Sequence, residues 1–161
     1  MSEYDDLLCE AYRGEVFGES FFRSLAHAEL GNMQHEKLRL LQDVEAQTAS
    51  RLRPLIDAAG IDPGSEQHTA TEAALLADTV REQPWTVFLE GLRSALPEFL
   101  EKFRRLQSIA ADPDDPILVE LIAHEQAIDR FAALELEGRS SDAVAVLRDH
   151  LDSSLSEHRG I

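Results

Sequence analysis

The sequence predicts an all-helical fold, with residues 1–161 forming one domain. Three observations lead to this prediction. Apolar residues recur three and four positions apart through long stretches, which is the period of an α-helix with one buried face. Gly, Pro and Asn interrupt these stretches at only a few places, where helices are expected to end. No segment of useful length shows the strict apolar and polar alternation that predicts a strand.

The first two helices are expected to form an antiparallel pair. They are predicted over residues 3–30 and 33–59. Gly31 and Asn32 between them are typical of a helix C-cap, and so short a turn places the two helices side by side. Pro54 lies inside the second helix, where it predicts a kink or an early end.

A second antiparallel pair is predicted over residues 85–110 and 117–136, joined by a short polar turn. Pro97 is expected to bend the first of these helices. A short C-terminal helix, capped by Ser141, is expected to follow. The apolar stripe of residues 85–110 is expected to face the interior and consists of Trp85, Phe88, Leu92, Leu96, Phe99, Phe103 and Leu106.

The two hairpins are separated by a long crossover at residues 60–84. Its Gly and Pro residues predict a loop, and residues 71–77 predict a short helix. Two antiparallel helix hairpins joined by one long crossover make a four-helix bundle that differs from a simple up-and-down bundle.

Several carboxylates fall near the inward stripe of their helices. Glu15, with Glu19 one turn later, does so in the first helix, Glu45 in the second, and Glu125 in the fourth beside His124. Glu15 and Glu45 lie about 24 Å and about 21 Å from the turn at 1.5 Å per residue, so they are level across antiparallel helices. We therefore expect Glu15, Glu45 and Glu125 to share a small cavity at mid-bundle, with Glu19 and His124 at its rim.

This topology and these carboxylates resemble the ferritin-like superfamily of di-iron carboxylate proteins. The resemblance covers residues 3–138 and implies a bundle that holds metal ions between its helices. The family's site uses a Glu from each of two helices and Glu-x-x-His from each of the other two.

The sequence departs from the family's site in three places. Thr48 and Ile128 stand where the two histidines belong. The helix over residues 85–110 offers only apolar residues on its inner stripe, since Glu98 and Glu101 project outward. The resemblance therefore implies an incomplete metal site at Glu15, Glu19, Glu45, His124 and Glu125, able to take iron, manganese or zinc, or no metal at all.

Composition excludes several partners. The formal net charge of −16 disfavours nucleic acid and anionic membranes, because both attract clustered Lys and Arg. The N-terminal residues lack the basic and apolar regions of a signal peptide, which predicts a cytoplasmic location. No phosphate-binding, dinucleotide-binding or nucleophile-turn motif occurs, so no substrate or reaction is predicted.

Three functions stay open at this point. The first is a ferritin-like metal-binding protein with an incomplete site. The second is a metal-free structural or interaction protein on the same scaffold, in which the carboxylates bond to Tyr12, Thr48, water or an Arg. The third is a small-molecule pocket lined by Tyr12, Phe22, Phe99 and Phe103. Phe17 and Phe21 project away from Glu15, toward the crossover, the C-terminal helix or a subunit interface, and they predict a homodimer.

Overall fold

A computed structural model describes residues 1–27 and 32–159, with the side chains of residues 1–27 and 34–153. The described residues form helices and turns and contain no strand, so the all-helical prediction is confirmed. The predicted turn at Gly31 lies outside the described residues. The helices are α1 (Glu3–Ala26), α2 (Asn32–Ala58), α3 (Glu66–Val80), α4 (Trp85–Ile109), α5 (Pro116–Leu136) and α6 (Ser140–Arg159).

The helix ends follow local capping chemistry. Ser2 and Asp5 form a capping box at the start of α1, with the Ser2 hydroxyl accepting from the Asp5 amide at 3.1 Å. The Asp115 carboxylate caps α5 by accepting from the Ile117 amide, and Pro116 takes the first helical position, where its missing amide hydrogen costs nothing. α2 continues past Pro54 as far as Ala58, so the early end considered from the sequence does not occur.

Two helices are longer than predicted. α3 begins at Glu66, because the Ser65 hydroxyl accepts from the His68 amide and starts the helix ahead of its apolar residues. α6 runs over 20 residues instead of forming a short helix. Its sequence supports the greater length, because Leu147, Leu151 and Leu155 stand four positions apart and no Gly or Pro interrupts residues 140–159.

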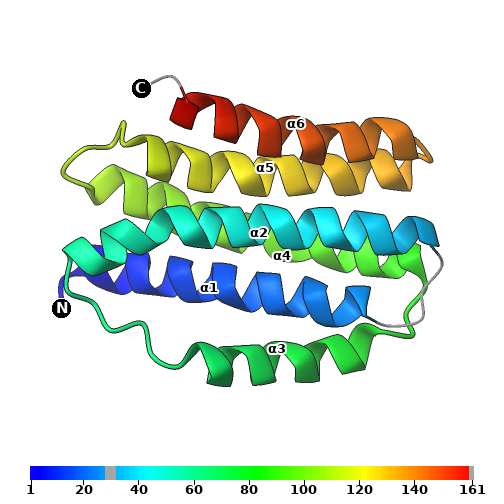
Figure 1. Cartoon of the computed structure of the whole chain (residues 1–161), viewed down its shortest axis with the longest axis horizontal. Coiled ribbons are helices and arrows are strands. Elements are labelled where there is room, and N and C mark those ends of the chain that lie inside the picture. Colours follow the sequence, from blue (N-terminus) through cyan, green and yellow to red (C-terminus); the bar gives the residue numbers. More distant parts are fainter. Residues whose placement is uncertain (28–31, 160–161) are drawn as a thin grey trace.

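The helices lie side by side along the long axis of the molecule (Figure 1). α1 packs against α2, and α4 packs against α5, each as an antiparallel pair; the contacts α1–α4 and α2–α5 join the pairs. α3 packs on the outside of α1, and α6 covers α5 and α2. α3 thus lies within the crossover and brings the chain back to the end where α4 begins.

The buried core consists of two hydrophobic clusters. The Phe131 cluster contains Phe22, Leu41, Leu96 and Ile128 among others. The Leu8 cluster lies toward the other end of the same helices and contains Tyr12, Leu52, Phe103 and Leu121 among others. In α1, α2 and α5 the buried residues between the two clusters are polar, and they include the residues of the site described below.

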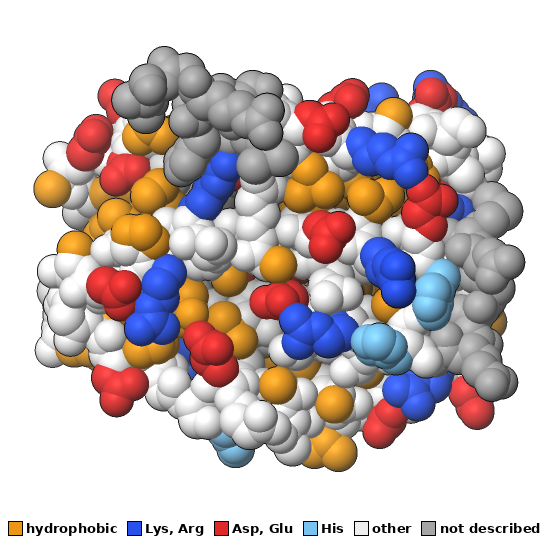
Figure 2. Space-filling view, in the orientation of Figure 1, with side chains coloured by type: hydrophobic (Ala, Val, Ile, Leu, Met, Phe, Trp, Pro, Cys, Tyr) orange, Lys and Arg blue, Asp and Glu red, His pale blue; other side chains and the backbone are white. Residues whose placement is uncertain are grey.

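The surface carries charges of both signs. On the face shown in Figure 2, acidic and basic side chains are interspersed with hydrophobic ones. The negative net charge is therefore not gathered into a single patch on that face. None of the described helices has the length and apolar character needed to cross a membrane. The cytoplasmic location stays a prediction.

Candidate metal centre

Three buried side chains from three helices converge in the polar layer between the two hydrophobic clusters. They are Glu15 of α1, Glu45 of α2 and His124 of α5, and one ligand atom from each lies within 4.8 Å of the others. The exposed fractions are 2%, 7% and 0%. The level positions predicted for Glu15 and Glu45 therefore bring their carboxylates together.

His124 occupies the centre of this group. Its Nε2 lies 3.0 Å from Glu15 Oε2, 3.8 Å from Glu45 Oε2 and 3.6 Å from Glu125 Oε1. The sequence placed His124 at the rim, and that placement is wrong. α5 packs against α2, α4 and α6, so its buried stripe is wide enough to include a residue one turn from both Leu121 and Ile128.

The hydrogen bond of His124 Nδ1 determines whether Nε2 carries a hydrogen in the neutral ring. Nδ1 lies within hydrogen-bonding reach of the Leu121 carbonyl oxygen, and a carbonyl can only accept, so Nδ1 carries the hydrogen. In the neutral imidazole, Nε2 then presents a lone pair to the carboxylates. A lone pair that faces three carboxyl groups requires a proton or a metal ion between them.

Glu125 Oε2 is buried and has no hydrogen-bond partner among the described residues. Glu15 Oε2 and His124 Nε2 lie 3.0 Å apart but form no well-directed hydrogen bond with each other or with another described residue. The glutamates Glu135 and Glu120 also have little exposed side-chain surface, but each forms an ion pair with a Lys or Arg. Lys37, Trp85 and Ser140 donate to Glu135, and Arg51 pairs with Glu120. In the described part of the chain, no Lys or Arg forms an ion pair with Glu15, Glu45 or Glu125, and the basic side chain that lies within 4 Å of their oxygens is the His124 imidazole.

The partners suggested for a metal-free cluster are engaged elsewhere. The Tyr12 hydroxyl donates to Glu66 at 2.8 Å, away from the cluster. Thr48, at the position of a family histidine, donates to the Val44 carbonyl at 2.8 Å. Glu19 is half-buried and pairs with Arg23 on its own helix, so it lies outside the group of converging ligand atoms.

Burial controls the protonation of the carboxyl groups. Desolvation raises the pKa of Glu15 to about 8; the hydrogen bond with Glu45 acts to lower it and the charge of Glu125 to raise it. Desolvation also raises the pKa of Glu125 to about 7, against the attraction of His124. The pKa of Glu45 lies well above its usual value because of desolvation and then the charge of Glu15. Without a cation, the cluster retains protons near neutral pH.

Gly18 makes room for the Glu45 side chain. A Cβ at position 18 would lie 2.8 Å from Glu45 Cδ and 2.9 Å from Oε2. Gly18 thus admits a carboxylate from α2, whereas a Cβ at Gly14 would meet nothing within 4 Å.

α4 supplies no carboxylate to the described cluster. Glu98 and Glu101 are exposed, as predicted, and Phe88 and Phe103 are buried. Phe99 departs from the predicted interior position, since 41% of it is exposed. α1 packs much less closely against α4 than against α2, which leaves a space between α1 and α4 that the Phe99 ring lines.

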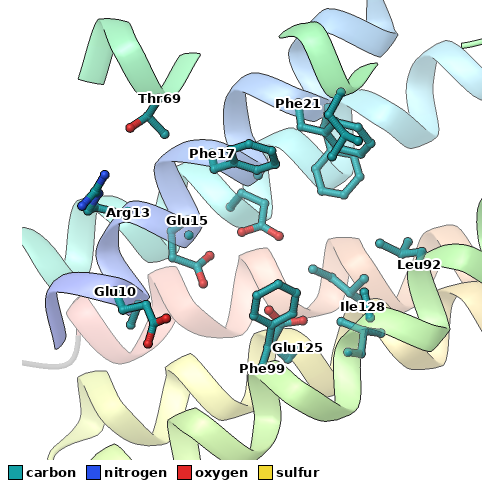
Figure 3. A pocket seen from close by; sticks show the side chains of 18 of the residues that line it. Glu10, Arg13, Glu15, Phe17, Phe21, Thr69, Leu92, Phe99, Glu125 and Ile128 are labelled. Atoms are coloured by element: carbon teal, nitrogen blue, oxygen red, sulfur yellow. The ribbon is translucent and has the colours of Figure 1, made fainter. Parts of the chain in front are cut away.

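That space is a cavity of about 670 Å³ between α1, α3 and α4. Glu15, Glu45 and Glu125 form part of its lining, so the candidate metal centre borders the cavity. Figure 3 shows Glu15, Glu125 and Phe99 directed toward the same space. Phe22, Phe99 and Phe103 line the cavity as the sequence suggested, whereas Tyr12 belongs to the Leu8 cluster.

Phe17 and Phe21 also line this cavity. Phe21 stacks on Phe88 with ring centroids 6.3 Å apart, so the neighbouring helix α4 covers part of it. Residues of α3, which lies in the crossover, line the same cavity. Of the three positions considered from the sequence for Phe17 and Phe21, the structure therefore agrees with the one beneath the crossover. The homodimer stays a prediction.

Comparison with known proteins returns no similar protein: no protein-family model, curated protein or solved structure matches the chain. The function is therefore argued from the site alone.

Proposed function

We propose that this protein is a ferritin-like four-helix bundle that binds a divalent transition metal ion at Glu15, Glu45 and His124. Glu125 supplies a further carboxylate beside them. α1, α2, α4 and α5 would form the bundle, and α3 would lie in its crossover. The observation that carries the proposal is the position of His124 Nε2, which faces buried carboxylates that no described Lys or Arg neutralises.

The chemistry of the donor set supports this proposal. An ionised carboxylate buried away from water is costly unless it is paired, protonated or bound to a cation. Two or three carboxylates with one imidazole suit iron, manganese or zinc, which accept both oxygen and nitrogen ligands. The hydrogen bond from Nδ1 to a backbone carbonyl is the kind of contact that orients a metal-binding histidine.

A rival proposal is a metal-free scaffold in which Glu15 and Glu45 share a proton. The observation that favours it is their mutual hydrogen bond, which acts to lower the pKa of Glu15 and raise that of Glu45. The missing family histidines also favour it. In that case the cluster binds no metal, and the protein has a structural role or binds a partner.

Metal analysis separates the two proposals. Protein purified without an affinity tag or chelator should contain close to one equivalent of a transition metal, measured by elemental analysis. Stripped protein should bind Mn²⁺ or Zn²⁺ in calorimetric titration, and His124→Gln should weaken that binding at least tenfold. Glu98→Gln is the matched surface control and should bind as wild type does. Stripped wild type that takes up neither ion would overturn the metal proposal in favour of the scaffold.

A further inference from the structure

The cavity beside the candidate metal centre has the size and lining of a small-molecule site. Its volume of about 670 Å³ falls in the range of pockets that enclose small ligands. Aromatic rings dominate two of its walls: Phe17 and Phe21 on α1, and Phe88, Phe99 and Phe103 on α4. Such walls favour an apolar body that displaces poorly bound water.

Two glycines keep the cavity wide. Gly14 on α1 and Gly91 on α4 both line it, and a Cβ at either position would meet no atom within 4 Å. Glycine is unfavourable inside a helix compared with alanine, and neither residue has a φ that requires it. Their small size matters here because it leaves the space open.

The cavity has one buried polar end. Glu15, Glu45 and Glu125 are all buried and line it. Glu125 Oε2 accepts no hydrogen bond from a described residue, and Glu15 Oε2 faces His124 Nε2, at 3.0 Å. His124 does not line the cavity and lies behind these carboxylates. A ligand that fills the apolar part would therefore place one end against the candidate metal centre.

We propose that this cavity binds a small molecule with an apolar body and a neutral oxygen head group, an alcohol or a carbonyl, which lies at the carboxylate end. The choice of head group rests on the proposed metal site. Three carboxylates and one divalent cation carry a net negative charge, which disfavours an anionic head. An ammonium head has no lone pair with which to bind a metal ion.

The opposite orientation predicts a different ligand. Arg13 and Lys102 also line the cavity, and Lys102 pairs with Glu10 at 3.0 Å. An apolar carboxylic acid could place its head there and its tail among the rings. Since the two orientations call for opposite head-group preferences, a series of ligands with one tail distinguishes them.

The test uses 1-octanol, octanoate and octylamine as probes, titrated calorimetrically into the full chain with and without Mn²⁺. Gly14→Phe fills the cavity from α1, and Ala95→Phe does so from α4 should the first variant fold poorly. Ala145→Phe adds the same ring at an exposed position of α6, outside the cavity. Circular dichroism checks the fold of each variant, and elemental analysis gives its metal content.

The proposal expects 1-octanol to bind the Mn²⁺-loaded protein at least tenfold more tightly than octanoate or octylamine. Gly14→Phe or Ala95→Phe should weaken octanol binding at least tenfold, and Ala145→Phe should leave it unchanged. Equal binding to the cavity-filling variants, or a preference for octanoate, overturns it. Failure of the metal proposal is a separate result, in which elemental analysis finds no bound metal in the wild-type protein. If metal-free wild type binds octanol and the metal-free cavity-filling variants do not, the cavity is supported as the binding site independently of the metal.

Discussion

Gly18 of α1 lies against the Glu45 carboxylate of α2, at a distance that leaves no room for a Cβ at position 18 unless the carboxylate moves. The nearest atom to a Cβ there would be Glu45 Cδ, at 2.8 Å. Since that atom is near the end of a flexible side chain, a larger residue would displace the carboxylate more readily than the helix. The position of a candidate ligand on one helix thus depends on a missing side chain on another.

We predict that Gly18→Ala weakens Mn²⁺ binding at least tenfold while the fold is kept. Gly14→Ala is the matched control on the same helix, where a Cβ meets nothing within 4 Å. It should raise stability by about 0.5–1 kcal/mol and leave Mn²⁺ affinity unchanged. Calorimetric titration and urea denaturation measure both effects. Equal Mn²⁺ affinity in the two variants would show that the contact with Gly18 does not position Glu45.

We predict that Glu45→Gln lowers metal content and the stability of the metal-loaded protein together, because a ligand that binds only the folded state stabilises it. The melting temperature of wild type should fall when a chelator is added, and that of Glu45→Gln should not. The rival scaffold predicts the reverse. In that case the chelator does not change the melting temperature of wild type. Glu45→Gln has a higher melting temperature than wild type, because the variant removes a buried carboxyl group that can ionise.

We predict that the stability of the metal-free protein falls as pH rises through the neutral range. Burial raises the pKa of Glu15 to about 8 and that of Glu125 to about 7, above the usual 4.5. The folded state therefore holds protons that the unfolded chain releases, so this contribution is fully present below about pH 4.5 and is lost by about pH 8. Urea denaturation across this range should show the decline, and Glu15→Gln should reduce it.

We predict that saturating Mn²⁺ reduces the loss of stability that the metal-free protein shows as pH rises. Metal binding requires deprotonated carboxylates, so affinity rises with pH and binding releases protons. Calorimetry in buffers of different ionisation enthalpy measures that release. Binding without proton release near neutral pH would contradict the raised pKa values.

We predict that Lys37→Met destabilises the protein by about 3–5 kcal/mol, because it leaves a buried carboxylate without its cation. The side chains of Lys37 and Glu135 are only 6% and 4% exposed. Lys102→Met removes the same atoms from a surface pair with Glu10, and its cost should be below about 1 kcal/mol. Chemical denaturation compares the two variants. Equal costs would contradict the burial of the Lys37 pair.

The sequence predicted the all-helical class and the level of Glu15 and Glu45, since both depend on regular helical geometry. It did not predict the central position of His124, because the width of a buried stripe depends on how many helices surround it. The role of Gly18 depends on a neighbouring helix and has no local signal. The cavity depends on the spacing between α1 and α4, which periodicity does not determine.

The polar layer between the Phe131 cluster and the Leu8 cluster also sets the alignment of three helices. A slide of α1, α2 or α5 by one helical turn, about 5.4 Å, would carry its Glu or His out of the layer and into one of the hydrophobic clusters. Apolar side chains alone would tolerate such a slide better, since one leucine can replace another. Each wrong alignment leaves a buried carboxyl or imidazole group facing hydrocarbon. The residues that stabilise the core least thus discriminate most strongly between the native alignment and its shifted alternatives.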